Sequence, residues 1–220
     1  MSVETLLQER FSTRAYLPKA IPEQELKDIF AAAQRSASNC NTQPWEPIVV
    51  AGEKLKVLEK ELLKEVMAGN KPNPDFNWMI KYAGVHRDRQ WGSAIALYNS
   101  LGIEREDKKA RLEAMGRNWQ FFGAPHAVFF TMDKYLDIMG AVDIGIYAQN
   151  LTLLMSERGI SSIMQGALGQ FPNPVRKMFD LPEERGVLFG MSFGYADTQH
   201  PSSKCKTVRE PLEDVVRFES

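Results

Sequence analysis

Apolar side chains recur along this chain at two spacings, which predict where it forms helices and strands. Leu26, Ile29 and Ala33 fall on one stripe with helical periodicity, and Pro22 stands where the first residue of that helix is expected. The β-branched run at 48–50 is typical of a buried strand. The same reasoning predicts helices near 3–10, 22–33, 55–66, 82–116, 139–158 and 175–179, and strands near 45–51, 127–132, 160–164 and 186–195.

Glycine and proline divide these elements. Gly102 begins a turn that splits the long helical stretch 82–116, Gly159 suits the end of the helix before it, and 69–77 is a Pro- and Asn-rich break. Strands separated by helices, without a repeat period, predict an α+β or α/β sandwich. Spacing alone leaves the order of the strands open.

Composition limits the kind of partner. The chain has 220 residues, of which 44% are hydrophobic and 25% charged, so it suits one domain or one domain with an inserted excursion. Its formal net charge is −1, which predicts no general attraction to nucleic acid or to an acidic membrane. Any anion site must therefore come from local basic clusters.

The chain also favours an intracellular location. Its 2 cysteines, Cys40 and Cys205, are fewer than a secreted disulfide framework usually has. The first residues lack the basic and apolar regions of a signal peptide, and we see no apolar run of the roughly 20 residues that span a bilayer. We expect a soluble cytoplasmic protein.

Two basic clusters near the ends of the chain are candidate anion sites. Arg10 and Arg14 flank Ser12, and guanidinium groups together with a hydroxyl match the oxygens of a phosphate. A second group contains Lys204, Lys206 and Arg209. Each cluster, taken alone, is also typical of a solvated charged turn.

Polar residues beside two predicted strands are further candidates. Ser38, Asn39 and Asn41 lie in a loop before the strand at 45–51, where they could equally bond their own backbone. Gln165 and Gly166 follow the strand at 160–164, where glycine could simply serve a turn.

Other chemistries are less well supported. The three histidines are scattered, without the spacing of metal ligands, and His126 is expected to be structural. The aromatic stretch 119–122 is expected in the core, although one of its rings could border a substrate pocket. Phosphate-binding loops, dinucleotide fingerprints and nucleophile elbows are all missing from the sequence, which favours chemistry carried by a bound cofactor.

Taken in order, these segments resemble the nitroreductase family of FMN-dependent enzymes. The matching pieces are RFSTR at 10–14, SNCNTQPW at 38–45, GI at 159–160 with QG at 165–166, GMSFGYAD at 190–197 and KTVREPL at 206–212. The stretch NWQFFGAP at 118–125 is similar to the nitrobenzoate-reductase-like branch. The resemblance covers nearly the whole chain.

The resemblance implies an α+β three-layer sandwich with a central, mainly antiparallel sheet flanked by helices. It implies one domain over 1–220, with a variable helical excursion around 69–117 near the substrate pocket. It also implies a homodimer that binds FMN at the subunit interface and uses NAD(P)H to reduce nitroaromatics, quinones or activated alkenes.

Roles for the candidate residues follow from the resemblance. Arg10, Ser12 and Arg209 would hold the phosphate and ribityl end of FMN, and Arg14 would lie near N1 and O2 of its ring. Gln165 and Gly166 would present backbone amides near N5 and O4. The residues that would reach the same FMN from the partner subunit are Ser38, Asn39 and Asn41.

The chain departs from the family at Ala37, where many relatives have proline, and at Thr207, where some have a basic residue. Contacts of Asn70 and Lys206 with FMN remain open. Two alternatives also stay open: an FMN-binding sensor without turnover, and, with less support, a reductive dehalogenase of iodotyrosine-like substrates.

Overall fold

Four antiparallel strands form the central sheet of the computed structural model, which describes residues 1–77 and 80–219. The strands are β1 (Glu46–Ala51), β2 (His126–Asp133), β3 (Ser161–Gln165) and β4 (Arg185–Gly194). Their order across the sheet is β1-β2-β4-β3, and every neighbouring pair is antiparallel. The predicted antiparallel sheet is therefore confirmed.

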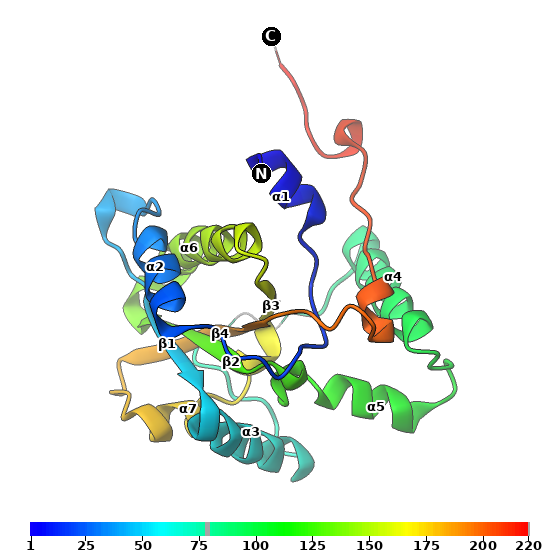
Figure 1. Ribbon diagram of the computed structural model, residues 1–220, viewed down its shortest axis with the longest axis horizontal. Helices are drawn as coiled ribbons and strands as arrows, with labels where there is room; N and C mark the ends of the chain where they lie inside the picture. Colours follow the sequence, from blue (N-terminus) through cyan, green and yellow to red (C-terminus); the bar gives the residue numbers. More distant parts are fainter. Residues whose placement is uncertain (78–79, 220) are drawn as a thin grey trace.

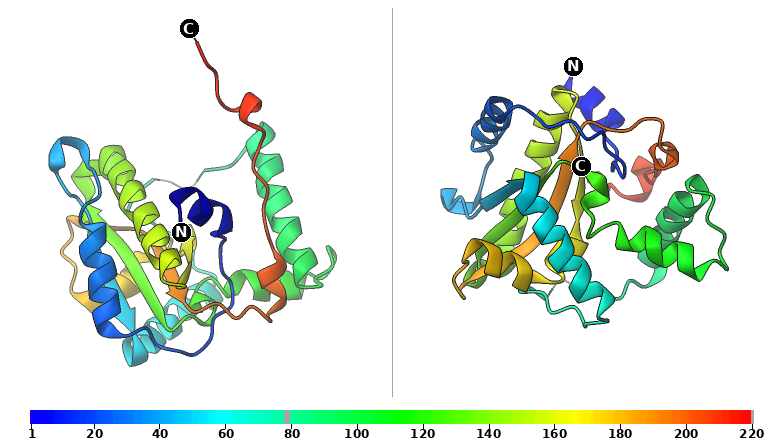
Figure 2. Two further views of the ribbon diagram at one scale, coloured as in Figure 1. Left: turned by 45° about the horizontal axis from the view of Figure 1, so that its top comes forward. Right: turned by 60° about the horizontal axis from the view of Figure 1, so that its bottom comes forward.

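Helices cover both faces of the sheet (Figure 1). On one face lie α2 (Glu23–Ala33) and α6 (Asp137–Glu157), with α1 (Val3–Glu9) packed against α6. The opposite face carries α3 (Gly52–Met67) and α7 (Pro172–Phe179). The remaining pair, α4 (Gly84–Ser100) and α5 (Lys108–Gly116), extends to the side of the sandwich (Figure 2).

The central strand β2 supplies side chains to both cores. Val128 and Phe130 pack with α2 and α6, whereas Ala127 and Phe129 pack with α3 and α7, and all four are fully buried. Successive side chains of a strand point to opposite faces, so a strand between two helical layers is apolar at every position. This arrangement accounts for the apolar residues of the strand predicted at 127–132. Thr131 interrupts them, and its hydroxyl donates to the backbone carbonyl of Glu46 at 2.6 Å.

Two of the element boundaries that differ from the predicted ones involve a proline. Pro22 caps α2 instead of opening it, and the helix begins at Glu23. α7 begins at Pro172, earlier than its apolar periodicity indicates, because proline is well suited to the first turn of a helix. Gly102 has a φ of +66° between α4 and α5, as the predicted turn requires.

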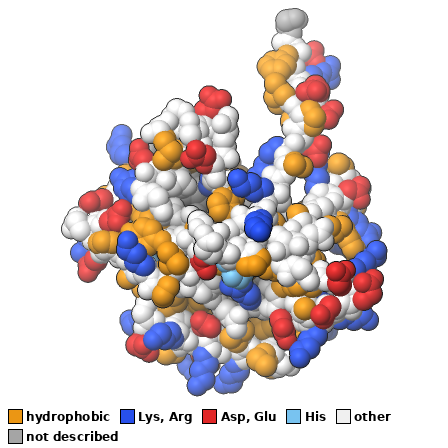
Figure 3. All heavy atoms as spheres, turned by 45° about the vertical axis from the view of Figure 1, so that its right-hand side comes forward, with side chains coloured by type: hydrophobic (Ala, Val, Ile, Leu, Met, Phe, Trp, Pro, Cys, Tyr) orange, Lys and Arg blue, Asp and Glu red, His pale blue; other side chains and the backbone are white. Residues whose placement is uncertain are grey.

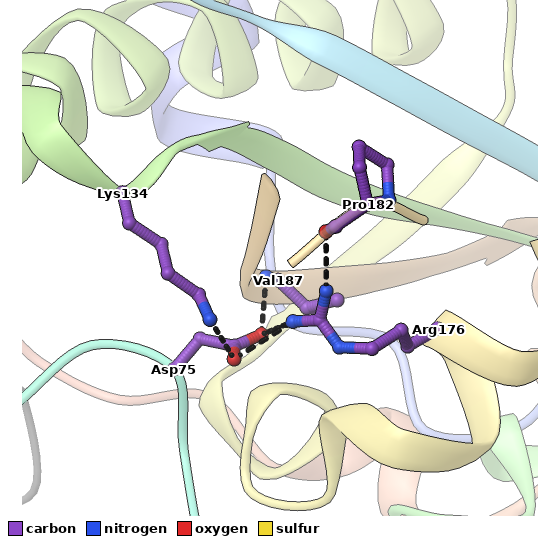
Figure 4. Close-up of polar contacts among 5 residues, drawn as sticks. All are labelled: Asp75, Lys134, Arg176, Pro182 and Val187. Carbon is purple, nitrogen blue, oxygen red and sulfur yellow. Dashed lines mark hydrogen bonds and ion pairs between the residues drawn. The ribbon is translucent and has the colours of Figure 1, made fainter. Parts of the chain in front are cut away.

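Asp75 ties the segment before α4 to the sheet (Figure 4). Its buried carboxylate accepts two hydrogen bonds from Arg176, at 2.9 and 3.0 Å, and one from the backbone N–H of Val187 at 2.9 Å. The ammonium group of Lys134 lies 3.1 Å away. The chain leading towards α4 is therefore held at a defined point on the sandwich.

One helical stretch, 134–157, is long and apolar enough to cross a membrane by length and composition, with a mean hydropathy of 1.3. The sequence predicts no apolar run long enough to span a bilayer, and this helix is an exception to that prediction. Of its apolar window, 44% is buried in the structure, and its residues Ile144, Tyr147 and Leu151 belong to the core. The core helix of a globular sandwich passes the same criterion.

The C-terminal segment leaves the body of the molecule and projects beside α1 and α4 (Figures 1 and 3). It carries apolar side chains in the open: Val208 is 89% exposed and Phe218 81%. Exposed apolar groups on a segment of this kind suit a contact with another chain.

Candidate functional site

The segment from Arg10 to Tyr16 is bonded to the sheet beside β3. The backbone N–H of Thr13 donates to the carbonyl of Ser162 at 3.2 Å. The hydroxyl of Tyr16 lies within hydrogen-bond distance of the Thr13 and Ser192 carbonyls, at 3.0 and 3.1 Å. These bonds hold the first predicted basic cluster along one edge of the sandwich.

Arg10 and Arg209 lie near opposite ends of the chain, but in the fold their positive charges are close enough to interact. Burial lowers the pKa of the Arg10 guanidinium, and the nearby positive charge of Arg209 lowers it further. Among the described residues, the side chain of Arg209 donates to the hydroxyl of Thr207 and to the backbone carbonyls of Thr207 and Val208. Over 1–77 and 80–219 neither arginine forms an ion pair with a carboxylate, so the pair offers its donors to an added anion.

Unpartnered hydroxyls lie close to this pair. Thr13 and Ser162 are buried, and within the described part of the chain their hydroxyl oxygens have no hydrogen-bond partner. Ser162 and Arg10 also line a cavity of about 150 Å³. The edge of β3 thus carries unused polar groups as well as positive charge.

Ser12 and Arg14 occupy the same edge. Nη1 of Arg14 donates to the backbone carbonyl of Ser12 at 3.1 Å, which turns the guanidinium back along its own segment. Burial lowers the pKa of Arg14, and both side chains are half-buried. Ser12 and Arg14 therefore lie on the same short segment as Arg10, whose charge interacts with that of Arg209.

Gln165 ends β3 and uses its side chain inside the protein. Its Oε1 accepts from the hydroxyl of Ser192 at 2.5 Å, and its Nε2 donates to the backbone carbonyl of Asn118 at 2.9 Å. The Gln165 side chain is buried, whereas Gly166 is exposed. What this corner can offer a ligand is consequently its backbone. Sequence reasoning did not single out Ser192, because a serine in a buried strand carries no distinguishing signal.

The turn after Gln165 lies directly on β4. A Cβ at Gly169 would come within 2.3 Å of the carbonyl oxygen of Leu188, so only glycine allows this approach. The short helix η4 (Gly166–Gly169) is thereby held against the sheet. Gly166 receives its position from this contact and from the bonds of Gln165.

The loop with Ser38, Asn39 and Asn41 lies elsewhere. It is on the far side of α6 from α1 (Figures 1 and 2), and the backbone N–H of Asn39 donates to the carboxylate of Asp143 in α6 at 3.0 Å. The backbone N–H of Gln43 donates to the Ser38 hydroxyl at 2.9 Å. Within one chain, these three residues do not join the arginines.

The backbone of this loop adopts left-handed conformations that are unfavourable for most residues. Cys40, Asn41 and Gln43 have φ values of +48°, +58° and +47°, a region that residues other than glycine rarely adopt. Such local strain persists where surrounding contacts hold it and often marks a functional segment. Asp143 supplies one of those contacts.

Three other predicted positions have definite places. The Asn70 amide donates to the Glu65 carboxylate at 2.5 Å, and Lys206 is exposed in the C-terminal segment. His126 is structural, as predicted: its Nε2 accepts from the backbone N–H of Ile21 at 3.0 Å. The aromatic side chains of Trp119, Phe121 and Phe122 are buried in the core.

Comparison with known proteins identifies the family. The model described as "Nitroreductase family" matches residues 7–195, which contain all but one of the predicted site residues. The chain belongs to the nitroreductase family. The resemblance predicted from the ordered motifs is therefore confirmed.

Similar proteins match this nitroreductase family member along nearly its whole length. Nitroreductase NfnB of Mycolicibacterium smegmatis is 33% identical over 218 residues, which cover 99% of this chain and 92% of the relative. A 4-nitrobenzoate reductase of Pseudomonas putida is 30% identical, with 98% and 94% covered. The crystal structure of an FMN- and NADPH-dependent nitroreductase NfnB from "sphigopyxis sp. strain HMH" superposes with a TM-score of 0.96 at 28% identity, covering 100% of both chains.

Proposed function

We propose that this protein is an FMN-dependent oxidoreductase that takes electrons from NAD(P)H and reduces nitroaromatic, quinone or activated-alkene acceptors. One observation carries the proposal: two arginines, Arg10 and Arg209, lie near the start of β3, and a tightly held glycine turn lies at its end. A fully extended chain would span about 13 Å over the four steps from Ser162 to Gly166. This arrangement suits a ligand with a phosphate at one end and a planar ring at the other.

The residues present fit FMN. Arg10, Ser12 and Arg209 would hold its phosphate and ribityl end, where the hydroxyls of Thr13 and Ser162 lack partners in the described structure. The backbone of Gln165 and Gly166 would meet the reactive edge of the ring. When bound, FMN supplies the two-electron carrier that separates oxidation of NAD(P)H from reduction of the acceptor. The relative from the "sphigopyxis" strain, named as dependent on FMN and NADPH, supports this choice.

Arg14 has a different task from Arg10. In the proposed site it would lie near N1 and O2 of the ring, where a fixed positive charge favours the negative charge gained on reduction. Its bond to the Ser12 carbonyl and its half-buried position limit its movement. Hydride transfer to the ring removes no proton from NAD(P)H, so the proposed reaction requires no side chain as a general base.

A homodimer would complete the site. Exposed apolar side chains line one face of α6, where Ile138 is 75% exposed, Met139 51% and Val142 54%. The loop of Ser38, Asn39 and Asn41 is held on this same helix through Asp143. In a symmetric pair, a face of this kind would pack on its copy and carry the loop to the partner's FMN.

The excursion over 69–117 would border the substrate pocket, although its residues 78–79 lie outside the described part. Cys40 and Cys205 are both free thiols, which suits the cytoplasm.

Purified protein tests the proposal directly. We expect a yellow solution with about one FMN per chain, and oxidation of NAD(P)H that depends on an added nitroaromatic or quinone. Replacing Arg209 with Gln removes one charge-assisted hydrogen bond of about 1.5–3 kcal/mol, so FMN should bind about 10- to 100-fold more weakly. Arg105→Gln, an exposed arginine between α4 and α5, is the matched control and should leave FMN binding unchanged.

The outcomes separate the alternatives. A protein that binds FMN but does not turn over with either class of acceptor would favour a sensor. Deiodination of an iodotyrosine without activity on nitroaromatics would favour the dehalogenase. A colourless chain that takes up no added FMN would contradict the proposed site as a whole.

A further inference from the structure

An apolar groove lies between α3 and α5, outside the residues assigned to FMN. It has a volume of about 700 Å³, in the range of small-molecule sites. Its walls include Leu63 and Val66 from α3, Met115 from α5 and Ile103 from the turn before α5. A groove of this size and composition suits one flat aromatic ring or two.

Arg117 and His200 form the polar part of this groove. Nη1 of Arg117 lies 3.4 Å from Nε2 of His200, and Nη2 donates to the carbonyl of Phe122 at 3.3 Å. The guanidinium also lies over the Phe122 ring, 5.8 Å from its centre. Across 1–77 and 80–219, Arg117 has no ion pair with a carboxylate, and Glu113, which also lines the groove, lies 4.0 Å from Lys109.

The hydrogen bonds at Nδ1 of His200 determine whether its other ring nitrogen, Nε2, is a donor or an acceptor. The backbone N–H of Ser202 points at Nδ1 of His200 at 3.2 Å, and the Ser202 hydroxyl lies 2.8 Å from the same atom. A backbone N–H can only donate, so Nδ1 accepts and the ring proton is on Nε2. Nε2–H and the Arg117 guanidinium are then two donors facing each other without an acceptor between them. Burial and the charge of Arg117 lower the pKa of His200, which keeps the ring neutral.

We propose that Arg117 and His200 recognise the carboxylate of an aromatic acceptor whose ring lies along the α3–α5 groove. Two converging donors, one of them charged, match the two oxygens of a carboxylate, and the apolar walls match the ring. The inference deepens the proposed function, on which it rests, by naming the substrate class.

The two residues after Arg117 connect the groove to the corner proposed to face the FMN ring. Asn118, next to Arg117, accepts from Nε2 of Gln165 at 2.9 Å. Trp119 donates from its indole N–H to the carbonyl of Ala167 at 3.1 Å. Asn118 and Trp119 therefore bond to the residues on either side of Gly166, so the backbone that carries Arg117 is fixed to that turn.

Direct binding by the flavin-loaded protein tests the carboxylate contact without relying on turnover. In calorimetry, benzoate should bind saturably, its neutral analogue benzamide at least about tenfold more weakly, and acetate weakly because it lacks the ring. Arg117→Gln should weaken benzoate about tenfold or more, and Arg117→Lys, which keeps the charge, should recover part of the loss. Arg111→Gln removes a half-buried arginine of α5 that does not line the groove, and should bind benzoate normally.

Turnover then separates this inference from the proposed function. With 4-nitrobenzoate, Arg117→Gln should raise KM about tenfold, while KM for nitrobenzene stays unchanged because that substrate has no carboxylate. Equal binding of benzoate and benzamide, or an unchanged ratio of the two KM values, would overturn the inference and leave the proposed function intact. Loss of turnover with both acceptors in the wild-type protein would instead overturn the proposed function.

Discussion

The arginines of the proposed site differ in their surroundings and in the roles that we assign to them. Arg10 and Arg209 form no ion pair with a carboxylate within 1–77 and 80–219, and the charge of Arg209 lowers the pKa of Arg10. Arg14 belongs to the same sequence motif as Arg10, yet its guanidinium is turned towards its own backbone at Ser12. We assign the first pair to holding an anion, and Arg14 to tuning the ring.

Replacing Arg14 tests whether this residue tunes the ring without being needed to hold the anion. Arg14→Gln should slow the reduction of the bound flavin by NAD(P)H about 10- to 100-fold, because a preorganised charge beside the ring is lost. FMN should stay largely bound, since the phosphate contacts remain. Stopped-flow measurement of the flavin absorbance under anaerobic conditions gives the rate, and flavin released on denaturation gives the occupancy. Reduction as fast as in the wild type would remove Arg14 from this role.

The sequence allowed a role to be predicted for a residue only where the residue belonged to a series of motifs in the order typical of the family. Arg10, Ser12 and Arg14 were found as a local cluster, and Arg209 was linked to them only through the family pattern. The Arg117–His200 pair was missed, because the two residues are far apart along the chain and both lie just outside the motifs at 118–125 and 190–197. Their meeting depends on how α5 and the segment before η5 (Pro201–Lys204) pack, which periodicity does not report.

At the scale of elements, the spacing of apolar residues predicted most helices and strands. Each helix buries one apolar face, and a central strand such as β2 buries two. It placed the start of α7 too late, since Pro172 and its neighbours are set by capping and not by an apolar stripe. It also left the strand order open, because the pairing of β2 with β4 joins segments far apart in sequence. The start of α7 and the strand order were both missed because neither is determined by the apolar periodicity within a single element.

The turn η4 offers a test at this scale. Gly169→Ala would place a methyl group 2.3 Å from the Leu188 carbonyl oxygen, so η4 or β4 must shift. We expect a loss of about 1–3 kcal/mol in the free energy of unfolding, measured by urea titration at saturating FMN. FMN affinity should fall as well, because the same turn positions Gly166.

The matched control is Gly92→Ala in α4. A Cβ at that position meets nothing within 4 Å, and alanine is the better helix former by about 1 kcal/mol. This variant should be as stable as the wild type or more so. If both glycine variants unfold at the same urea concentration, the close approach of η4 to β4 does not govern stability.

At the scale of the whole molecule, the predicted site residues fall into two groups on opposite sides of α6. Arg10 and Gly166 belong to the edge at β3, whereas Ser38 and Asn41 lie across the helix (Figure 2). Each copy then carries half of two sites, and a symmetric pair built on the apolar face of α6 joins the halves. Cofactor binding and assembly should therefore depend on each other.

A charge on the apolar face of α6 tests that dependence. Val142 is 54% exposed, and in a symmetric interface an introduced aspartate enters twice, so the like charges should cost several kcal/mol. We expect the wild type to sediment as a dimer, and Val142→Asp to sediment as a monomer that loses FMN on dilution. Val57→Asp makes the same change at a 52% exposed valine of α3, on the opposite layer, and should stay dimeric and loaded. A wild-type monomer that holds one FMN would contradict the shared site, and a Val142→Asp dimer would place the interface elsewhere.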